Sequence, residues 1–130
     1  VLVAEELDLP FVYVRASAKG HGMGNLIEGH IEKGQKAVII EDLVSTGGSS
    51  LKAVNALREA ECEVLGMLAI FTYGFKVAED NFANANCELT TLGDYEGLIN
   101  KASEKGIVSA ELKDTLQEWR QSPETWMSID

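Results

Sequence analysis

The chain has 130 residues and an acidic balance, with 11 Lys and Arg against 21 Asp and Glu and a net charge of −10. That length suits one domain with its own core, and the charge disfavours binding to nucleic acids or to an anionic membrane. No apolar run approaches the roughly 18–20 residues of a membrane span, and no signal peptide opens the chain. Cys62 and Cys87 form no CxxC pair and make a sparse disulfide framework, so we expect reduced, buried thiols in a cytoplasmic protein.

Helical and strand patterns alternate along the chain. Helical spacing over residues 1–7 is followed by a β-prone run at 11–14, a glycine-rich loop at 16–26 and a short strand at 27–31. The apolar runs 37–40 and 64–71 predict strands buried on both faces, and 89–92 predicts a third, shorter strand. Helices are expected at 49–61, 75–84, 95–105 and 110–121, the last capped by Ser109. This order predicts a single α/β domain over residues 1–130, with a parallel sheet.

The most informative stretch runs from Val38 to Ser50. Two adjacent carboxylates, Glu41 and Asp42, are expected to leave the buried strand at its carboxyl end, the usual ligand edge of a parallel sheet. Residues 45–50, rich in hydroxyls and glycine, then open a helix, so free backbone N–H groups and the helix dipole point to one spot. The segment predicts a phosphorylated sugar, with its phosphate on residues 45–49 and its ribose diol on the two carboxylates.

An ordinary helix cap is the alternative explanation of the same run. Ser and Thr are common at helix N-termini, and an acidic turn before them needs no ligand. The segment matches neither the GxxxxGK[ST] pattern of a Walker A loop nor the GxGxxG pattern of dinucleotide binding. The local pattern by itself therefore leaves both a sugar-phosphate site and a structural cap open.

Residues 38–50 resemble the phosphoribosyl-pyrophosphate signature of the type I phosphoribosyltransferases, in which an apolar strand precedes two acidic residues and a Ser/Thr-Gly-rich loop. Upstream, residues 14–22 and 25–29 are similar to the flexible catalytic loop of orotate phosphoribosyltransferases, which carries Arg, Lys and His-Gly. Both motifs stand in the family's order, and the resemblance covers nearly all of the chain. It implies the type I phosphoribosyltransferase fold, a mostly parallel central sheet flanked by helices, with a flexible catalytic loop.

By that resemblance, the reaction transfers the phosphoribosyl group from phosphoribosyl pyrophosphate to orotate with Mg²⁺, giving orotidine 5′-monophosphate and pyrophosphate in pyrimidine synthesis. Lys19, His21 and Asp42 would be the catalytic residues, and Ser45 and Tyr73 stand at orotate-binding positions. The Mg²⁺ ion would be held mainly through the substrate, without direct protein ligands. The phosphoribosyl-pyrophosphate site implied by the resemblance comprises Arg15, Lys19, His21, Glu41, Asp42, Leu43, Val44, Ser45, Thr46, Gly47, Gly48 and Ser49.

Three positions depart from the family pattern. Ala16 stands where a second loop lysine is frequent, Gly20 replaces an acidic residue, and Tyr73 occupies the position of an arginine that pairs with orotate. Tyrosine donates a hydrogen bond but forms no bidentate ion pair. Two alternatives therefore stay open: a phosphoribosyltransferase for another base, and a non-catalytic regulator that binds phosphoribosyl pyrophosphate.

The resemblance also has implications for assembly. It implies a homodimer in which loop 16–26 reaches the neighbouring active site, so that Lys19 and His21 serve the other subunit. The implied partners are small-molecule substrates, with neither nucleic acid nor membrane among them. Because family members are longer than 130 residues, the resemblance implies that an amino-terminal part of the family domain is absent before Val1.

Overall fold

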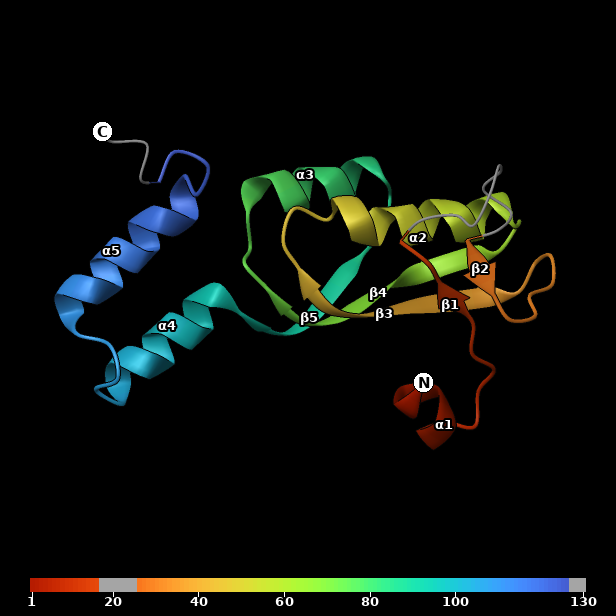
Figure 1. The fold of residues 1–130 in the computed structure, drawn as a ribbon, viewed down its shortest axis with the longest axis horizontal. Coiled ribbons are helices and arrows are strands. Elements are labelled where there is room, and N and C mark those ends of the chain that lie inside the picture. The colour runs from red at the N-terminus through yellow and green to blue at the C-terminus, as the bar shows by residue number, and fades with distance from the viewer. Residues whose placement is uncertain (17–25, 127–130) are drawn as a thin grey trace.

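The computed structural model describes residues 1–16 and 26–126, and its helices and strands follow one another in the order that the sequence predicts (Figure 1). Helix α5 begins at the predicted cap, where Ser109 Oγ accepts a hydrogen bond from the Leu112 N–H at 3.2 Å. In chain order the elements are α1 (Leu2–Glu6), β1 (Tyr13–Val14), β2 (Ile27–Glu28), β3 (Lys36–Val44), α2 (Gly48–Glu59), β4 (Glu63–Thr72), α3 (Lys76–Asn84), β5 (Leu89–Asp94), α4 (Tyr95–Glu104) and α5 (Ala110–Gln121).

The central sheet is parallel, with strand order β3-β4-β5, which confirms the predicted α/β class. Strands β3 and β4 pair from Lys36 opposite Glu63 to Val44 opposite Thr72. Strand β5 joins the other side of β4, and its last residue, Asp94, pairs with Thr72. Because the three strands run in one direction, their carboxyl ends meet at one edge of the sheet.

Helices α2 and α3 lie on one side of this sheet (Figure 1), where Val54, Leu57 and Phe82 pack into the core with Ile39 and Met67. The expectation that the strands are buried on both faces is wrong for the described residues. Side chains alternate between the two faces of a strand, and no described helix packs along the second face. The apolar side chains there, which we call the open face, are exposed by 49% at Val38, 50% at Ile40, 45% at Leu68, 60% at Ile70 and 87% at Leu92.

Strands β1 and β2 form a separate antiparallel ribbon, with Tyr13 opposite Glu28 and Val14 opposite Ile27. Both strands are shorter than the predicted 11–14 and 27–31. Gly29 ends β2 because its φ of 117° turns the chain out of the extended conformation. The ribbon brackets residues 16–26, so the two ends of that segment lie side by side.

Two further observations concern the thiols and the helices. Cys62 and Cys87 are free and buried, as predicted. Among residues 1–16 and 26–126, no helix is long and apolar enough to cross a membrane.

A pair of glycines allows the steric demand of the β3–α2 turn to be tested. Gly47 and Gly34 share a φ of 82°, but a Cβ on Gly47 would lie 2.7 Å from Phe82 Cε2, whereas a Cβ on Gly34 would meet nothing within 4 Å. We expect Gly34→Ala to lower the free energy of unfolding by about 1–2 kcal/mol through backbone strain. Gly47→Ala should lower the free energy of unfolding by a further ~1–3 kcal/mol, because the added Cβ overpacks against Phe82. Urea unfolding of the full-length protein measures both, and equal losses would contradict the ring contact.

Candidate functional site

The predicted acidic pair lies inside β3 instead of after it. Pairing with β4 continues past the expected end at Ile40, through Glu41 opposite Ala69, as far as Val44 opposite Thr72. Because successive strand residues point to opposite faces, the half-buried Glu41 faces the α2 side and the exposed Asp42 faces the other. Asp42 Oδ1 accepts a hydrogen bond from the Leu43 N–H at 2.7 Å. The expectation that both carboxylates leave the strand together is thus corrected.

Residues 45–49 form the turn from β3 into α2. Gly47 is the N-cap residue in a left-handed conformation, and no side chain accepts a hydrogen bond from the first N–H groups of the helix. Within the described residues, the hydroxyls of Ser45, Thr46 and Ser49 make no hydrogen bond to protein atoms. The run is therefore not a Ser/Thr cap. It leaves uncapped backbone donors and three hydroxyls together beside the sheet edge, a suitable arrangement for an anion.

Contacts from β4 and α3 hold this turn in place. Val44 O accepts hydrogen bonds from Thr72 Oγ1 at 3.1 Å and from the Tyr73 N–H at 3.3 Å. Asn81 Nδ2 on α3 donates to Thr46 O at 2.9 Å, and the Phe82 ring lies against Gly47. Sequence reasoning missed Thr72, Asn81 and Phe82, because no local pattern reports a contact made across 28 or 35 residues.

Arg15 follows β1 and forms an ion pair across the ribbon, with its Nε 3.0 Å from Glu28 Oε1. The Arg15 N–H also donates to Leu26 O at 2.8 Å, which closes the ribbon at the base of the predicted loop. Ala16 is exposed. Lys19, Gly20 and His21 lie outside the described residues.

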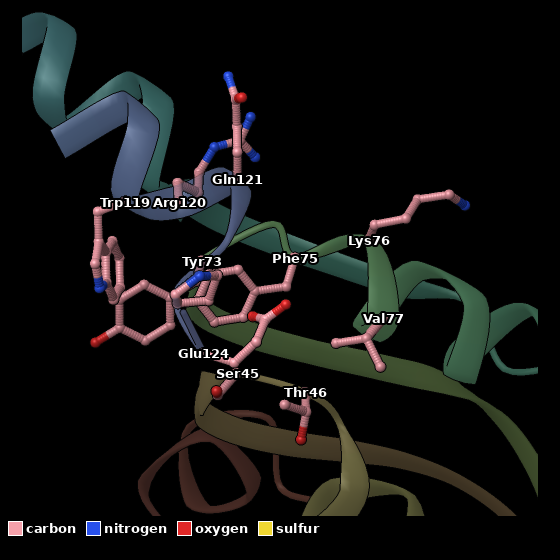
Figure 2. A pocket seen from close by; sticks show the side chains of 11 residues that line it. Ser45, Thr46, Tyr73, Phe75, Lys76, Val77, Trp119, Arg120, Gln121 and Glu124 are labelled. Atoms are coloured by element: carbon pink, nitrogen blue, oxygen red, sulfur yellow. The ribbon is translucent and has the colours of Figure 1, made fainter. Parts of the chain in front are cut away.

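A pocket of about 520 Å³ opens beside the turn (Figure 2). It contains both predicted orotate positions, Ser45 and Tyr73, which the fold brings together from the ends of neighbouring strands. Residues from the end of α5 complete it, and sequence analysis did not assign them to the site. The available signals were the alternating aromatics Phe71, Tyr73 and Phe75, and Trp119 in the last turn of an amphipathic helix. The lining residues are Ser45, Thr46, Tyr73, Phe75, Lys76, Val77, Trp119, Arg120, Gln121, Pro123 and Glu124.

Aromatic rings form one wall of the pocket and fasten α5 to the sheet. The Tyr73 and Phe75 rings stack with centroids 5.2 Å apart and planes 5° apart, and Trp119 meets both edge-on at 5.7 and 5.8 Å. Arg120 Nη1 donates to Gly74 O at 2.9 Å, and the Tyr95 hydroxyl donates to Leu116 O at 3.2 Å. Burial raises the pKa of Tyr95, with the charge of Arg120 opposing the rise.

The acidic side chains nearest the turn in sequence are Glu41 and Asp42. Within residues 1–16 and 26–126, no three His, Cys, Asp or Glu side chains cluster as they would around a metal ion. At the sheet edge, Glu41 and Asp42 are the oxygen donors closest in sequence to the turn, and both are hard ligands of the type that Mg²⁺ accepts.

Comparison with known proteins identifies the family. The phosphoribosyl transferase domain family matches residues 1–92. The chain belongs to the phosphoribosyltransferase family. The predicted fold class, with a parallel central sheet flanked by helices, is therefore confirmed.

Several curated relatives are similar to this chain over most of its length. The orotate phosphoribosyltransferase of Porphyromonas gingivalis is 57% identical over 125 residues, covering 96% of this chain and 60% of the relative. That of Listeria innocua is 56% identical over 124 residues, covering 95% of this chain and 59% of the relative. The chain thus spans about 60% of the length of the curated relatives it matches.

Solved structures give the same fold. Orotate phosphoribosyltransferase from Aeropyrum pernix superposes with a TM-score of 0.66 at 25% identity, over 78% of this chain and 55% of that one. The Mycobacterium tuberculosis orotate phosphoribosyltransferase, in complex with 5-phospho-α-D-ribosyl 1-diphosphate, gives a TM-score of 0.55 at 30% identity, over 67% of this chain and 48% of that one.

The link between α4 and α5 is expected to be sensitive to alkaline pH. Because the pKa of Tyr95 is raised in the folded state, its contribution to stability is complete below the unfolded pKa and is lost as pH rises through the folded pKa. Tyr95→Phe should lower the free energy of unfolding by about 0.5–1.5 kcal/mol at neutral pH, since the hydrogen bond to Leu116 O is lost. It should also flatten the decline in stability above about pH 10.

Urea unfolding across pH measures both effects in the full-length protein. Burial also raises the pKa of Cys87. The Tyr95→Phe variant therefore keeps the part of the decline of stability with pH that comes from Cys87. A variant whose pH dependence overlays that of the wild type would contradict the role of Tyr95.

Proposed function

We propose that the protein is an orotate phosphoribosyltransferase, which transfers the 5-phosphoribosyl group of phosphoribosyl pyrophosphate to orotate in pyrimidine synthesis. One observation carries the proposal: within the described residues, no side chain caps the N-terminus of α2, and the turn before it, which follows Glu41 and Asp42 in the sequence, opens onto an aromatic pocket. The curated relatives named orotate phosphoribosyltransferase, at 51–57% identity, support the choice of base.

The proposed roles follow the charge of each group. The 5′-phosphate binds the N–H groups and hydroxyls of residues 45–49. Glu41 and Asp42 accept hydrogen bonds from the ribose diol and stabilise the positive charge that builds on the ribose as its bond to pyrophosphate breaks. Since these two side chains point to opposite faces of β3, we infer that the ribose lies across the strand's carboxyl end, where both can reach it.

The leaving pyrophosphate gains negative charge, and cations in the 16–26 segment and directly before it would stabilise that charge. Arg15, Lys19 and His21 are the residues that the family resemblance assigns to this task. Arg15 already carries Glu28 as a counter-ion at 3.0 Å, which offsets part of the charge that Arg15 offers to the pyrophosphate.

Mg²⁺ fits the donor set at the sheet edge. The ion would supply positive charge to the leaving pyrophosphate, and it would need few protein ligands because Mg²⁺ usually keeps several waters and substrate oxygens. Glu41 and Asp42 would orient the hydroxyls that face the ion.

Assembly and location complete the proposal. We infer one phosphoribosyltransferase core over residues 1–130, acting as a homodimer in which segment 16–26 serves the neighbouring active site. A cytoplasmic location is supported by the two buried free thiols, which suit a reducing compartment.

Turnover with defined bases tests the proposed activity. The full-length protein, given phosphoribosyl pyrophosphate and Mg²⁺, is expected to consume orotate, measured by the change in ultraviolet absorbance, and to leave hypoxanthine and uracil untouched. Consumption of either of those bases instead of orotate would assign another phosphoribosyltransferase. Binding of phosphoribosyl pyrophosphate with no base consumed would assign a regulator.

A second prediction separates the 16–26 segment from general surface charge. Lys19→Ala should lower kcat by roughly 10²–10³-fold, as removal of one group that stabilises transition-state charge does, with stability unchanged. Lys33→Ala is the matched control, because Lys33 is exposed and ion-paired with Glu61 in a turn before β3. Steady-state kinetics measures both, and an unchanged rate for Lys19→Ala would leave that lysine without a catalytic role.

A further inference from the structure

The pocket presents a flat aromatic surface to whatever it binds. Tyr73 and Phe75 are half-buried, and their parallel rings lie between the Ser45–Thr46 turn and the end of α5 (Figure 2). Trp119 packs against the edges of both rings, which fixes their orientation. The volume of the pocket, about 520 Å³, is in the usual range for small-molecule sites. A planar heteroaromatic ring is the ligand shape that matches such a wall.

The charged side chains that line the pocket differ in how far other charges or water already neutralise them. Lys76 forms ion pairs with Asp80 and Glu79 and extends away from the rings (Figure 2). Glu124 is exposed, where water and salt screen its charge. Arg120 is half-buried, and no carboxylate of the described residues lies within 4.0 Å of its guanidinium. Among the described residues, Arg120 is thus the pocket's unneutralised cation.

A hydrogen bond to the backbone positions this guanidinium and leaves its other N–H donors for a ligand. Arg120 Nη1 donates to Gly74 O at 2.9 Å, which occupies one of five N–H donors. The glycine at position 74 leaves space for the guanidinium, because a Cβ there would lie 3.2 Å from Arg120 Nη1. The remaining donors keep the planar fork that suits a carboxylate.

We propose that Arg120 binds the carboxylate of the base substrate and so determines its specificity. The inference rests on the proposed function and supplies what the Tyr73 hydroxyl cannot, a planar cation able to bind both oxygens of a carboxylate. The cation comes from α5, 46 residues along the chain from Gly74. Uracil, the same ring without a carboxylate, gains nothing from Arg120, so Arg120 discriminates between the two.

Arg120→Gln and Arg120→Lys in the full-length protein test this role. We expect Arg120→Gln to raise the KM for orotate by roughly 10–100-fold, as loss of a charge-assisted pair does. The KM for phosphoribosyl pyrophosphate and the inhibition constant of uracil should change less than about twofold. Arg120→Lys keeps the charge without the fork and should fall between wild type and Arg120→Gln. Lys113→Gln, two turns earlier on α5 and outside the pocket lining, is the charge-matched control and should resemble wild type.

The ratio of orotate to uracil affinity is the deciding readout. A merely structural Arg120 would weaken both ligands alike when lost, and an unchanged ratio in Arg120→Gln would overturn the inference. Absence of orotate turnover by the wild-type protein would refute the proposed function instead. Calorimetric titration with orotate alone then decides about Arg120, since an orotate affinity that does not depend on Arg120 overturns its role.

Discussion

The carbonyl oxygen of Val44 is the point on which the site depends. It accepts the Thr72 hydroxyl and the Tyr73 N–H where β3 and β4 end together, and Gly74 in turn donates its N–H to Thr72 Oγ1 at 3.1 Å. Each such bond contributes about 0.5–1.5 kcal/mol to stability. For the site, it matters more that two of them share Val44 O as their acceptor. It sets the turn at residues 45–49 and the aromatic segment at residues 71–75 side by side, which makes one site from two separate strand ends.

Two helices then stabilise opposite halves of that site. Helix α3 supports the turn at residues 45–49 through Asn81 and Phe82, while α5 supports the aromatic wall through Trp119 and Arg120. Neither helix contains the backbone of that turn. The turn at residues 45–49 is thus an accessible segment that neighbouring rigid elements hold in position.

The sequence predicts the fold well because its signals are local. Continuous apolar runs, the Ser109 cap and the helical spacing of residues 110–121 each describe a short segment, and the structure confirms all of these elements. The end of β3 is a different case, because polar Glu41 and Asp42 look like a loop, and only pairing with β4 extends the strand through them. Tertiary hydrogen bonding overrides the local pattern there.

The candidate site also contains residues that a local pattern indicates and residues that only tertiary contacts place there. The roles proposed for Ser45, Thr46 and Gly47 could be predicted from the sequence, because residue types and order alone suggest them. Arg120 and Trp119 could not be predicted, since their place in the pocket depends on how α4 and α5 fold back toward residues 73–75. A helical pattern fixes which residues share a face, but it contains no information about which distant strand end that face will meet.

The open face of the sheet has a consequence for colloidal behaviour. Apolar surface such as that of Ile70 and Leu92 gains about 25 cal/mol for each Å² removed from water, which favours contact between copies. A net charge of −10 opposes that contact, but the repulsion fades beyond a Debye length of about 8 Å at physiological ionic strength. For residues 1–130 by themselves, salt concentration therefore sets the balance between dispersion and clustering.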